Sequence, residues 1–452
     1  MSNATTGAKT LVVGLGKSGL SCVRHLRARG IPTAVIDSRA QPPGLQPLRD
    51  SFPDVAVFLG GFDPEVFAAA ERLVVSPGVP VAEPLIQAAL ARGVEVIGDI
   101  ELFVQAARAP ICAITGSNGK STVTTLVGRM LAAAGQRVAV GGNLGEPALD
   151  LLDERVERYV LELSSFQLET TQGLRADTAT VLNLSADHMD RYASLDDYAA
   201  AKARIYCGAR VALVNRDDPR VLAMPRDAHA LELGFTLGAP VCESDLGVRE
   251  RDGRRWIHQG SRPLMPVDEV GIPGSHNLAN ALAALALAAA SGVAPEIGCE
   301  VLRRFEGLPH RSVLVGERDG VRWYDDSKGT NPGATLAALE GLAPADGLGR
   351  VVLIAGGDGK GADFAPLRAV VERTARAVVL IGRDAGRIAA ALDGVVPLVE
   401  AGSMREAVER AAAIAVPGDI VLLSPACASF DMFDGFEHRG RVFAEAVGGL
   451  TR

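Results

Sequence analysis

Residues 111–122, Ile-Cys-Ala-Ile-Thr-Gly-Ser-Asn-Gly-Lys-Ser-Thr, constrain the fold of this chain more than any other stretch. A run of apolar residues leads into a turn that holds two glycines, a lysine and several hydroxyl side chains. After the turn, apolar residues recur at helical spacing from Val123 to Leu131, and Gly135 closes the segment. The pattern predicts a strand, a loop and a helix, which is the repeating unit of a parallel α/β sheet.

A loop of this composition can bind phosphate. Small residues let several backbone N–H groups converge on one anion, and the helix N-terminus adds partial positive charge. Lys120 would reach the outer phosphates and Ser121 would ligate magnesium. The strict motif has glycine where Ile114 stands, so the match is to Gly-Lys-Ser and its context. The strand before it and the amphipathic helix after it favour a phosphate loop over a chance occurrence.

A second glycine-rich turn lies near the N-terminus. Residues 10–13 read as a buried strand, residues 14–19 (Gly-Leu-Gly-Lys-Ser-Gly) follow it, and a helix is expected over residues 20–29. Asp37 stands at the end of the next apolar run, where the dinucleotide fingerprint has an acid. The pattern indicates a nucleotide more securely than it indicates NAD. The alternative is a tight turn used only for packing.

Polar residues follow several apolar runs of the middle region, where ligands gather in doubly wound sheets. Glu162 is the natural second magnesium ligand, because an acid in an apolar strand is costly to bury without a partner; the alternative is an edge-strand carboxylate. His188 follows a later strand, although a lone histidine in a polar loop is more often a surface residue. The pattern around Lys202 predicts an ordinary lysine on a helix surface.

The later part of the chain offers further candidate loops. Asn277 and Asn280 stand one turn apart before a helix expected over residues 281–290, and capping is favoured over contact with a base. Lys360, in a glycine-rich turn, can hold a carboxylate or phosphate; the alternative is a solvated loop lysine. Strands over residues 351–354, 378–381 and 420–423 predict another open α/β sheet. Two boundaries are expected, a linker over residues 99–110 and a break over residues 307–311, whereas residues 221–265 are charged and irregular and are interpreted as short strands.

Composition excludes several classes of function. The 452 residues carry 46 Lys and Arg against 54 Asp and Glu, a net charge of −8, so no basic field favours nucleic acid. The six cysteines lack Cys-x-x-Cys spacing, which argues against a zinc site or a disulfide framework. The polar first nine residues lack a signal core, and the apolar run of residues 281–290 is too short to span a bilayer. We expect a cytoplasmic protein that binds no membrane.

Six motifs together are more specific than any one of them. They occur in one order along the chain: residues 115–121 (Thr-Gly-Ser-Asn-Gly-Lys-Ser), 162–167 (Glu-Leu-Ser-Ser-Phe-Gln), 187–190 (Asp-His-Met-Asp), 276–280 (His-Asn-Leu-Ala-Asn), 326–328 (Asp-Ser-Lys) and 424–429 (Ser-Pro-Ala-Cys-Ala-Ser). In this the chain resembles the Mur ligases of peptidoglycan synthesis over essentially its full length. The best match is to the branch that adds D-glutamate to UDP-N-acetylmuramoyl-L-alanine.

The resemblance implies an α/β protein of three domains. These would be a Rossmann-like UDP-binding domain over residues 1–102, a central P-loop ATPase-like domain with a mostly parallel sheet over residues 103–307, and a Rossmann-like amino-acid-binding domain over residues 308–452. It also implies that the N-terminal glycine-rich turn binds the uridine diphosphate of the substrate and not NAD. A monomer with small-molecule substrates is expected.

The resemblance also assigns residues to four groups, matched motif by motif. The UDP-substrate group is Lys17, Ser18, Asp37, Ser38, Arg39, Gly78 and Asn143. The ATP group is Gly116, Ser117, Asn118, Gly119, Lys120, Ser121, Thr122, Asn277, Asn280, Arg311, Asp326 and Lys328. The D-glutamate group is Thr330, Lys360, Ser429, Phe430 and Phe436. The catalytic and metal group is Lys120, Ser121, Glu162, His188 and Lys202, with Lys202 carbamylated and two Mg²⁺ ions, so that the resemblance overrides the plainer interpretations of His188 and Lys202.

The implied reaction activates a carboxylate with ATP as an acyl phosphate, which the amine of D-glutamate then attacks. Two alternatives stay open. One is another ligase of the same scaffold, adding a different amino acid or extending folate with glutamate. The other is an NAD-dependent oxidoreductase or a non-catalytic nucleotide sensor, based on residues 14–19 and Asp37, against which the second phosphate loop counts.

Overall fold

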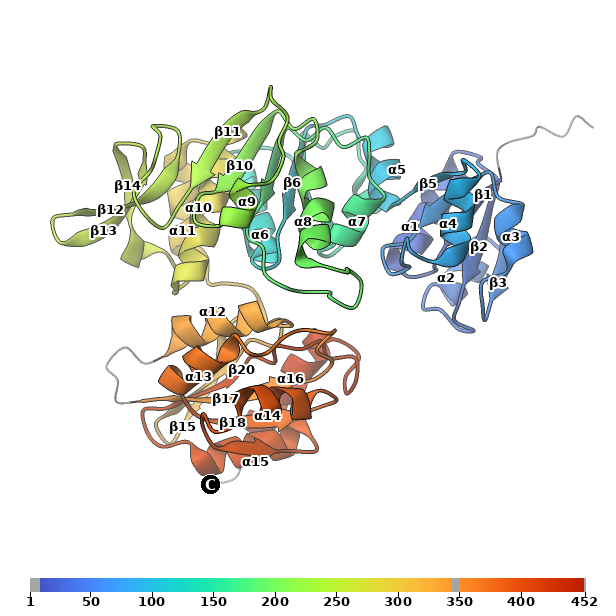
Figure 1. Cartoon of the computed structure of the whole chain (residues 1–452). Coiled ribbons are helices and arrows are strands. Elements are labelled where there is room, and N and C mark those ends of the chain that lie inside the picture. Colours follow the sequence, from blue (N-terminus) through green and yellow to red (C-terminus); the bar gives the residue numbers. More distant parts are fainter. Residues whose placement is uncertain (1–8, 344–348, 451–452) are drawn as a thin grey trace, which may run out of the picture.

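The computed structural model describes residues 9–343 and 349–450, and over these residues the chain forms three sheets in chain order (Figure 1). Each sheet is mostly parallel and is flanked by helices, so the predicted fold class of three α/β units is confirmed. The first eight residues of the polar N-terminal segment lie outside the described residues. Among the helices described, none combines the length and apolar character that crossing a bilayer requires.

The N-terminal unit is a five-stranded parallel sheet in the order β3-β2-β1-β4-β5, the order of a dinucleotide-binding fold. Its strands are β1 (Thr10–Val13), β2 (Thr33–Asp37), β3 (Ala56–Leu59), β4 (Arg72–Val75) and β5 (Glu95–Ile97). Its helices are α1 (Lys17–Ala28), α2 (Leu45–Ser51), α3 (Pro64–Ala68) and α4 (Pro84–Ala91). Helix α1 begins three residues earlier than expected. Its start lies inside the glycine motif, and Gly19 packs so close to the residue after β1 that a Cβ there would lie 2.0 Å from the Gly14 carbonyl oxygen.

The expected linker over residues 99–110 is wrong for most of its length, because residues 99–106 form helix α5 (Asp99–Ala106). Ile100 and Phe103 are fully buried, and the Phe103 ring meets the edge of Tyr159 in the central unit at 5.0 Å between centroids. One apolar core continues from β1 through α5 into the central sheet. The two units are therefore joined by a packed helix rather than by a flexible connection.

The central unit is a nine-stranded sheet in the order β14-β13-β12-β11-β10-β9-β6-β8-β7, with β12 to β14 antiparallel and the other pairs parallel. Its strands are β6 (Ile111–Thr115), β7 (Val138–Gly142), β8 (Arg158–Glu162), β9 (Thr178–Val181), β10 (Val211–Asn215), β11 (Leu231–Phe235), β12 (Leu246–Arg251), β13 (Arg254–Gln259) and β14 (Arg262–Pro266). Its helices are α6 (Lys120–Ala133), η1 (Ala148–Leu151), α7 (Ser165–Glu169), α8 (Leu195–Ala203), η2 (Arg204–Tyr206), α9 (Pro219–Leu222), η3 (Val267–Glu269), α10 (Ser275–Ala290) and α11 (Pro295–Arg304). Residues 221–265, charged and irregular in sequence, thus form the strands β11 to β13 and most of β14, as the interpretation of this region as short strands expected.

The C-terminal unit is a six-stranded sheet in the order β15-β16-β20-β17-β18-β19, parallel except for β15. Its strands are β15 (Val313–Arg318), β16 (Val321–Asp325), β17 (Val351–Gly356), β18 (Ala375–Ile381), β19 (Leu398–Glu400) and β20 (Ile420–Leu423). Its helices are α12 (Pro332–Leu342), α13 (Leu367–Thr374), α14 (Ala385–Leu392), α15 (Met404–Ile414) and α16 (Phe436–Gly448). The three expected strands correspond to β17, β18 and β20.

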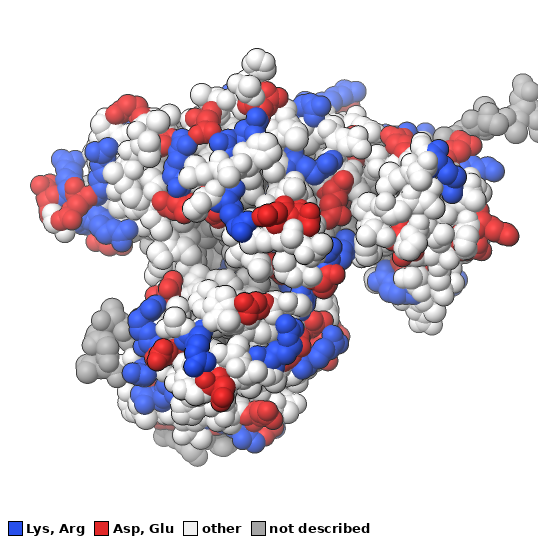
Figure 2. Space-filling model, in the orientation of Figure 1, with Lys and Arg blue, Asp and Glu red and all other residues white. Residues whose placement is uncertain are grey.

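The N-terminal and C-terminal units each adjoin the central unit (Figure 1). The N-terminal unit adjoins the end of the central unit that carries α5 and α7, and the C-terminal unit faces the central unit across α12. Acidic and basic side chains are interspersed over the face shown in Figure 2. The functional candidates lie where the carboxyl ends of the strands of these units face one another.

Candidate active site

The loop of residues 116–119 joins β6 to α6 as the sequence predicted. Gly119 has φ +83°, a backbone conformation that favours glycine, and a Cβ there would lie 2.2 Å from Oδ1 of Asn280. No side chain caps the first turn of α6. The positive end of this helix therefore faces the loop, the geometry of a phosphate site.

Lys120 opens α6 and folds back over the loop. Its Nζ donates to the carbonyl oxygens of Gly116 at 2.8 Å and Ser117 at 2.9 Å. Burial lowers the pKa of Lys120, and the carboxylates of Glu162 and Asp187 partly offset that effect. The ammonium thus lies in the loop with acidic groups nearby.

Glu162 ends β8, which runs between β6 and β7 inside the sheet, so the edge-strand interpretation is wrong. Its side chain is buried, and Oε1 accepts a hydrogen bond of 2.6 Å from Nδ2 of Asn143. Oε2 is buried without a hydrogen-bond partner among the described residues. A buried carboxylate oxygen with no donor suits a hard cation such as Mg²⁺, so the residues present fit a metal.

His188 lies in the loop after β9 with φ +57°. Its ring packs against Phe166 at 4.8 Å and Tyr198 at 6.5 Å between ring centres, and its side chain is 32% exposed. His188 is therefore partly buried in an aromatic cluster, and not the fully solvated residue that its sequence context suggested. Burial lowers the pKa of His188 to about 4, although Asp187 opposes this. The imidazole is therefore neutral at physiological pH, the form that ligates metals.

Lys202 contradicts the pattern that predicted a surface lysine. It is only 1% exposed, and its Nζ donates to the Gly116 carbonyl oxygen at 3.0 Å. The ammonium also lies 4.5 Å from the centre of the Tyr198 ring. Burial, with repulsion from Lys120, holds the pKa of Lys202 well below its ordinary value. The side chain reaches the underside of the phosphate loop as an amine that readily loses its proton.

Of the proposed metal group, Glu162 and His188 are the acidic and imidazole members. The described residues hold no cluster of three or more His, Cys, Asp or Glu side chains arranged for a metal. A complete ligand set here would therefore need the Ser121 hydroxyl, a modified Lys202 or the substrates themselves.

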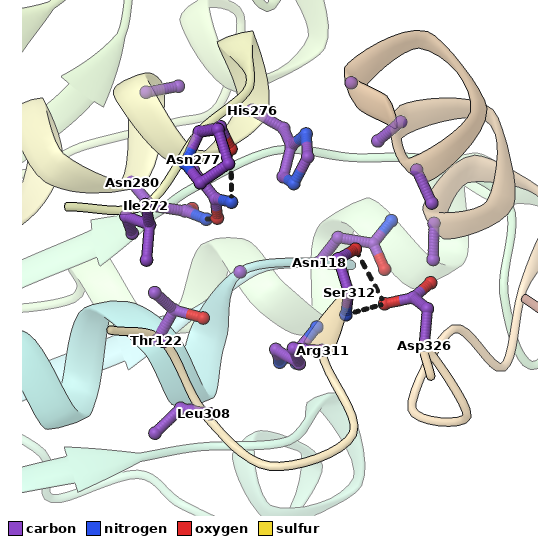
Figure 3. A pocket seen from close by; sticks show the side chains of 18 of the residues that line it. Asn118, Thr122, Ile272, His276, Asn277, Asn280, Leu308, Arg311, Ser312 and Asp326 are labelled. Carbon is purple, nitrogen blue, oxygen red and sulfur yellow. Dashed lines mark hydrogen bonds between the residues drawn. The ribbon is translucent and has the colours of Figure 1, made fainter. Parts of the chain in front are cut away.

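A first cavity of about 270 Å³ opens beside the phosphate loop (Figure 3). Seven members of the predicted ATP group line it: Asn118, Gly119, Thr122, Asn277, Asn280, Arg311 and Asp326. Apolar side chains, including Leu182, Phe235 and Ile272, line the same space. The combination of apolar side chains with several amides suits a nucleobase and its ribose.

The capping interpretation of Asn277 and Asn280 is wrong. Gly274 is the N-cap of α10, and no side chain caps the helix. Instead, Nδ2 of Asn277 donates to the Pro273 carbonyl oxygen at 2.7 Å, and Nδ2 of Asn280 donates to Oδ1 of Asn277 at 3.4 Å. Both amides face the cavity, because α10 starts six residues earlier than the sequence pattern indicated.

The polar wall of the first cavity comes from the C-terminal unit and the segment leading into it. Asp326 accepts hydrogen bonds from the Ser312 backbone N–H at 3.1 Å and the Ser424 hydroxyl at 2.7 Å. Burial raises the pKa of Asp326 to about 6, against these donors and the Arg311 guanidinium. Burial likewise lowers the pKa of Lys328 to about 8, and its ammonium lies 4.9 Å from the centre of the Phe436 ring.

A second cavity, of about 680 Å³, lies between the N-terminal and central units, and α16 of the C-terminal unit contributes Glu437 to its lining. All seven members of the predicted UDP-substrate group line it: Lys17, Ser18, Asp37, Ser38, Arg39, Gly78 and Asn143. Gln167 and Glu437, which the sequence did not single out, line it as well. The structure thus gathers residues that lie far apart in the sequence and come from all three units.

Asp37 forms hydrogen bonds and an ion pair with other residues of the protein. Its carboxylate accepts from the backbone N–H groups of Leu15 at 2.7 Å and Arg39 at 2.8 Å. It also forms an ion pair of 2.7 Å with the Arg39 guanidinium. Burial acts to raise the pKa of Asp37, but these donors outweigh it and the pKa is lowered. The acid therefore shapes the glycine turn and orients Arg39.

Four members of the predicted D-glutamate group lie on the loops after β16, β17 and β20, namely Thr330, Lys360, Ser429 and Phe430. Phe436 is the first residue of α16. Lys360 is engaged: its Nζ forms an ion pair of 2.5 Å with Oδ1 of Asp187 in the central unit, so it is not a solvated loop lysine. Ser429 is buried. Its neighbour Phe430 is 77% exposed.

Asp187 and Asn331 are the main residues that sequence reasoning missed. Asn331 caps α12, because its Oδ1 accepts from the Ala334 N–H at 2.9 Å. Its Nδ2 donates to Oδ1 of Asn118 and to Oδ2 of Asp187, at 3.1 Å in each case. An asparagine followed by proline is a helix-start signal that marked the cap, but nothing local marked the contact across units.

Three protein-family models match the chain in order. "Mur ligase MurD-like, N-terminal domain" matches residues 8–98, "Mur ligase middle domain" matches residues 114–288, and "Mur ligase, glutamate ligase domain" matches residues 310–427. Each match covers one of the three sheets.

Curated relatives are similar over the whole chain. A UDP-N-acetylmuramoylalanine–D-glutamate ligase of Pseudomonas putida is 57% identical, with 98% of this chain and 97% of that protein covered. Proteins of the same name are 55% identical in Marinobacter nauticus, with 100% of both chains covered, and 56% identical in Pseudomonas aeruginosa, with 97% of both covered.

Solved structures share the fold at low identity. MurF of Acinetobacter baumannii matches with a TM-score of 0.62 and 19% identity, covering 97% of this chain and 90% of that one. MurC of Thermotoga maritima matches with a TM-score of 0.61 and 18% identity, covering 97% of this chain and 98% of that one. At such identity the likeness concerns the fold alone.

Proposed function

The chain belongs to the Mur ligase family, and from this premise we propose that it joins D-glutamate to UDP-N-acetylmuramoyl-L-alanine with cleavage of ATP to ADP and phosphate. The full-length similarity to ligases of that name supports the substrates. The observation that carries the chemistry is the meeting of Lys120 and Lys202 at one carbonyl oxygen of the phosphate loop, that of Gly116. Glu162 and His188 lie near enough to these two lysines for their charges to interact.

We assign the second cavity to the UDP substrate and the first to ATP. Arg39 and the glycine turn would hold the uridine diphosphate of the former. Asn277 and Asn280 would face the adenine and ribose of ATP, while the loop N–H groups and Lys120 would bind its phosphates. The corresponding domains are residues 1–102, 103–307 and 308–452.

The family requires Mg²⁺, and we propose two sites. Ser121 and Glu162 would hold one ion, and His188 with a carbamylated Lys202 would hold the other. The Lys202 amine would attack CO₂ to form a carbamate and release one proton, which needs the neutral amine that its burial favours. Bound Mg²⁺ would neutralise the phosphate oxygens as charge develops on them.

The reaction then needs positioning more than a protein nucleophile. The L-alanine carboxylate of the substrate attacks the γ-phosphorus of ATP, so ADP leaves and an acyl phosphate forms. The amine of D-glutamate attacks the acyl carbon, loses a proton and expels inorganic phosphate, leaving an amide. Correct alignment of reactants of this kind can contribute about 7–11 kcal/mol. Lys120 would supply positive charge that offsets repulsion between the anions.

D-Glutamate would bind to Thr330, Lys360, Ser429, Phe430 and Phe436. Lys360 pairs with Asp187 in the structure, so its ammonium is already positioned at the junction with the central unit. Either the glutamate carboxylate replaces Asp187 as its partner, or it joins the pair. We further propose a monomeric, cytoplasmic protein that acts on small molecules only.

A panel of amino acids tests this function and separates it from the other ligases of the scaffold. Phosphate release is measured with ATP, Mg²⁺ and UDP-N-acetylmuramoyl-L-alanine, adding one amino acid at a time. D-Glutamate alone should give turnover, with L-glutamate, glycine and meso-diaminopimelate as controls. Turnover that depends on another amino acid, or on a UDP-sugar lacking L-alanine, would assign the chain to another branch.

A further inference from the structure

Asp99 is a buried acid that none of the roles above uses. It is the first residue of α5, which packs between α1 of the N-terminal unit and α7 of the central unit (Figure 1). The side chain is 2% exposed. Its Oδ2 accepts a hydrogen bond of 3.0 Å from Nε2 of Gln167, whereas Oδ1 is buried and accepts none from the described residues.

The partner, Gln167, lines the second cavity. Its carboxamide has a defined orientation, because Oε1 accepts from the Ser164 backbone N–H at 3.0 Å and must therefore point away from Asp99. Nε2 then donates one hydrogen to Asp99 and keeps a second. Ser164 thus fixes the oxygen of the Gln167 carboxamide, and Asp99 fixes its nitrogen.

The neighbourhood of Asp99 also includes Ser18 of the same cavity. Burial raises the pKa of Asp99, and the Gln167 amide, nearby backbone N–H groups and the Ser18 hydroxyl only partly offset it. Asp99 is therefore hydrogen-bonded to Gln167 on α7, and Ser18 on α1, which lines the same cavity from the other unit, lies near enough to affect the pKa of Asp99.

We propose that Asp99 is a positioning residue for the UDP substrate: it holds the Gln167 carboxamide so that its second N–H faces the second cavity. The inference rests on the proposed function, which places that substrate in the cavity. It also distinguishes Asp99 from Glu101, the other buried acid of α5, whose Oε2 accepts from the N–H groups of Gln172 at 2.7 Å and Gly173 at 2.8 Å. Glu101 ties the same two units together but does not line the cavity or contact a residue that does.

The test uses calorimetric binding of UDP-N-acetylmuramoyl-L-alanine to the full-length protein, together with the KM of each substrate and kcat. Asp99→Ala should raise the Kd about tenfold while kcat and the KM for ATP stay within about twofold, because one hydrogen bond and its orientation are lost. Asp99→Asn should stay within about threefold of the wild type, since its amide oxygen still accepts from Gln167. Glu101→Ala, the matched control, should leave the Kd unchanged even where it lowers the melting temperature.

A double-mutant cycle completes the test. In a Gln167→Ala background, Asp99→Ala should have no further effect on the Kd, because the group that it positions is gone. Additive effects, or equal rises in Kd for Asp99→Ala and Glu101→Ala, would overturn the inference. Should Asp99→Ala not fold, Asp99→Ser replaces it, since its hydroxyl is too short to reach Gln167. Failure of the wild-type protein to bind the UDP substrate would instead count against the proposed function.

Discussion

The two junctions of this molecule are built differently. Between the N-terminal and central units, apolar residues of β1, α5 and the central sheet form one continuous core, with Phe103 and Tyr159 in edge-to-face contact. Between the central and C-terminal units, the side-chain hydrogen bonds and the ion pair run through Asn118, Asp187, Asn331 and Lys360.

The difference separates two kinds of binding site. Apolar burial of this extent resists separation, so the part of the second cavity that the N-terminal and central units line is formed whether or not ligands are bound. Only Glu437 of the C-terminal unit depends on the polar junction for its place in that cavity. A few polar contacts exchange readily for water or ligand groups, so a site that depends on the C-terminal unit can open and close. Accordingly, we expect the UDP substrate to meet a site that is preformed except at Glu437, and ATP and D-glutamate to meet one completed by movement of the C-terminal unit.

The variant Lys120→Ala gives the largest expected effect, because it changes the proposed ATP site and leaves the second cavity intact. Loss of the phosphate-loop ammonium should lower phosphate release about 1,000-fold, because its charge faces the group being transferred. Binding of the UDP substrate should stay within about twofold, since the second cavity does not include Lys120. Release assays and calorimetry on one preparation measure both.

Lys17→Ala is the reciprocal variant, because Lys17 lines the second cavity and not the first. It should weaken binding of the UDP substrate and keep most of kcat at saturation.

Normal turnover by Lys120→Ala would refute the phosphate-loop assignment.

Phe103→Ala attacks the apolar junction directly. The side chain is fully buried, so its removal should lower the free energy of unfolding by about 3–5 kcal/mol through lost burial and a new cavity. Chemical denaturation measures the loss. Phe364→Ala, in the core of the C-terminal unit, is the matched control for removing a buried ring.

The comparison predicts a further difference between these two phenylalanine variants. Phe103→Ala should also raise the Kd for the UDP substrate, since it loosens the joint beneath the second cavity. Phe364→Ala should not. Equal Kd values for both variants would mean that the shared core does not hold that cavity in shape.

Asp326, in the C-terminal unit, should make the stability of the protein depend on pH. Its pKa is raised from the ordinary 3.8 to about 6 in the folded protein, so the protonated acid is the form that folding favours. This stability is fully present below pH 4 and is lost as the pH rises through 6. Asp326→Asn should remove this pH dependence. The free energy of unfolding of the variant, relative to that of the wild type, should therefore be about 2–3 kcal/mol higher at pH 7 than at pH 4.

Unfolding curves from pH 4 to 7 measure this change. Asp419→Asn is the opposite control, because its buried carboxylate is paired with Arg376 and its pKa is lowered. That variant should lose stability relative to the wild type near neutral pH, not gain it. A wild-type slope that persists in Asp326→Asn would assign the titration to another group.

The same division explains what the sequence could predict. Strands, glycine turns and the polar residues that follow them are local features, so the phosphate loop and Glu162 were readable directly. Lys202 was not, because the alanines beside it give its helix no polar or apolar face. Helix α5 was mistaken for a linker, since its buried side depends on two units at once. The pair of Asp187 and Lys360, 173 positions apart, leaves no local signal.

The smallest expected effect tests the polar junction alone. Asn331 caps α12 and also donates to Asn118 and Asp187, whereas Ser403 caps α15 in the same unit through the Glu406 N–H and contacts neither. Each alanine substitution should lower the free energy of unfolding by about 1 kcal/mol, the usual contribution of a cap. Only Asn331→Ala should also raise the KM for ATP and for D-glutamate, because only it weakens contacts across the junction. If small-angle scattering shows the same mean distance between units in both variants and the KM values agree, then apolar contacts, and not these amides, hold the C-terminal unit in place.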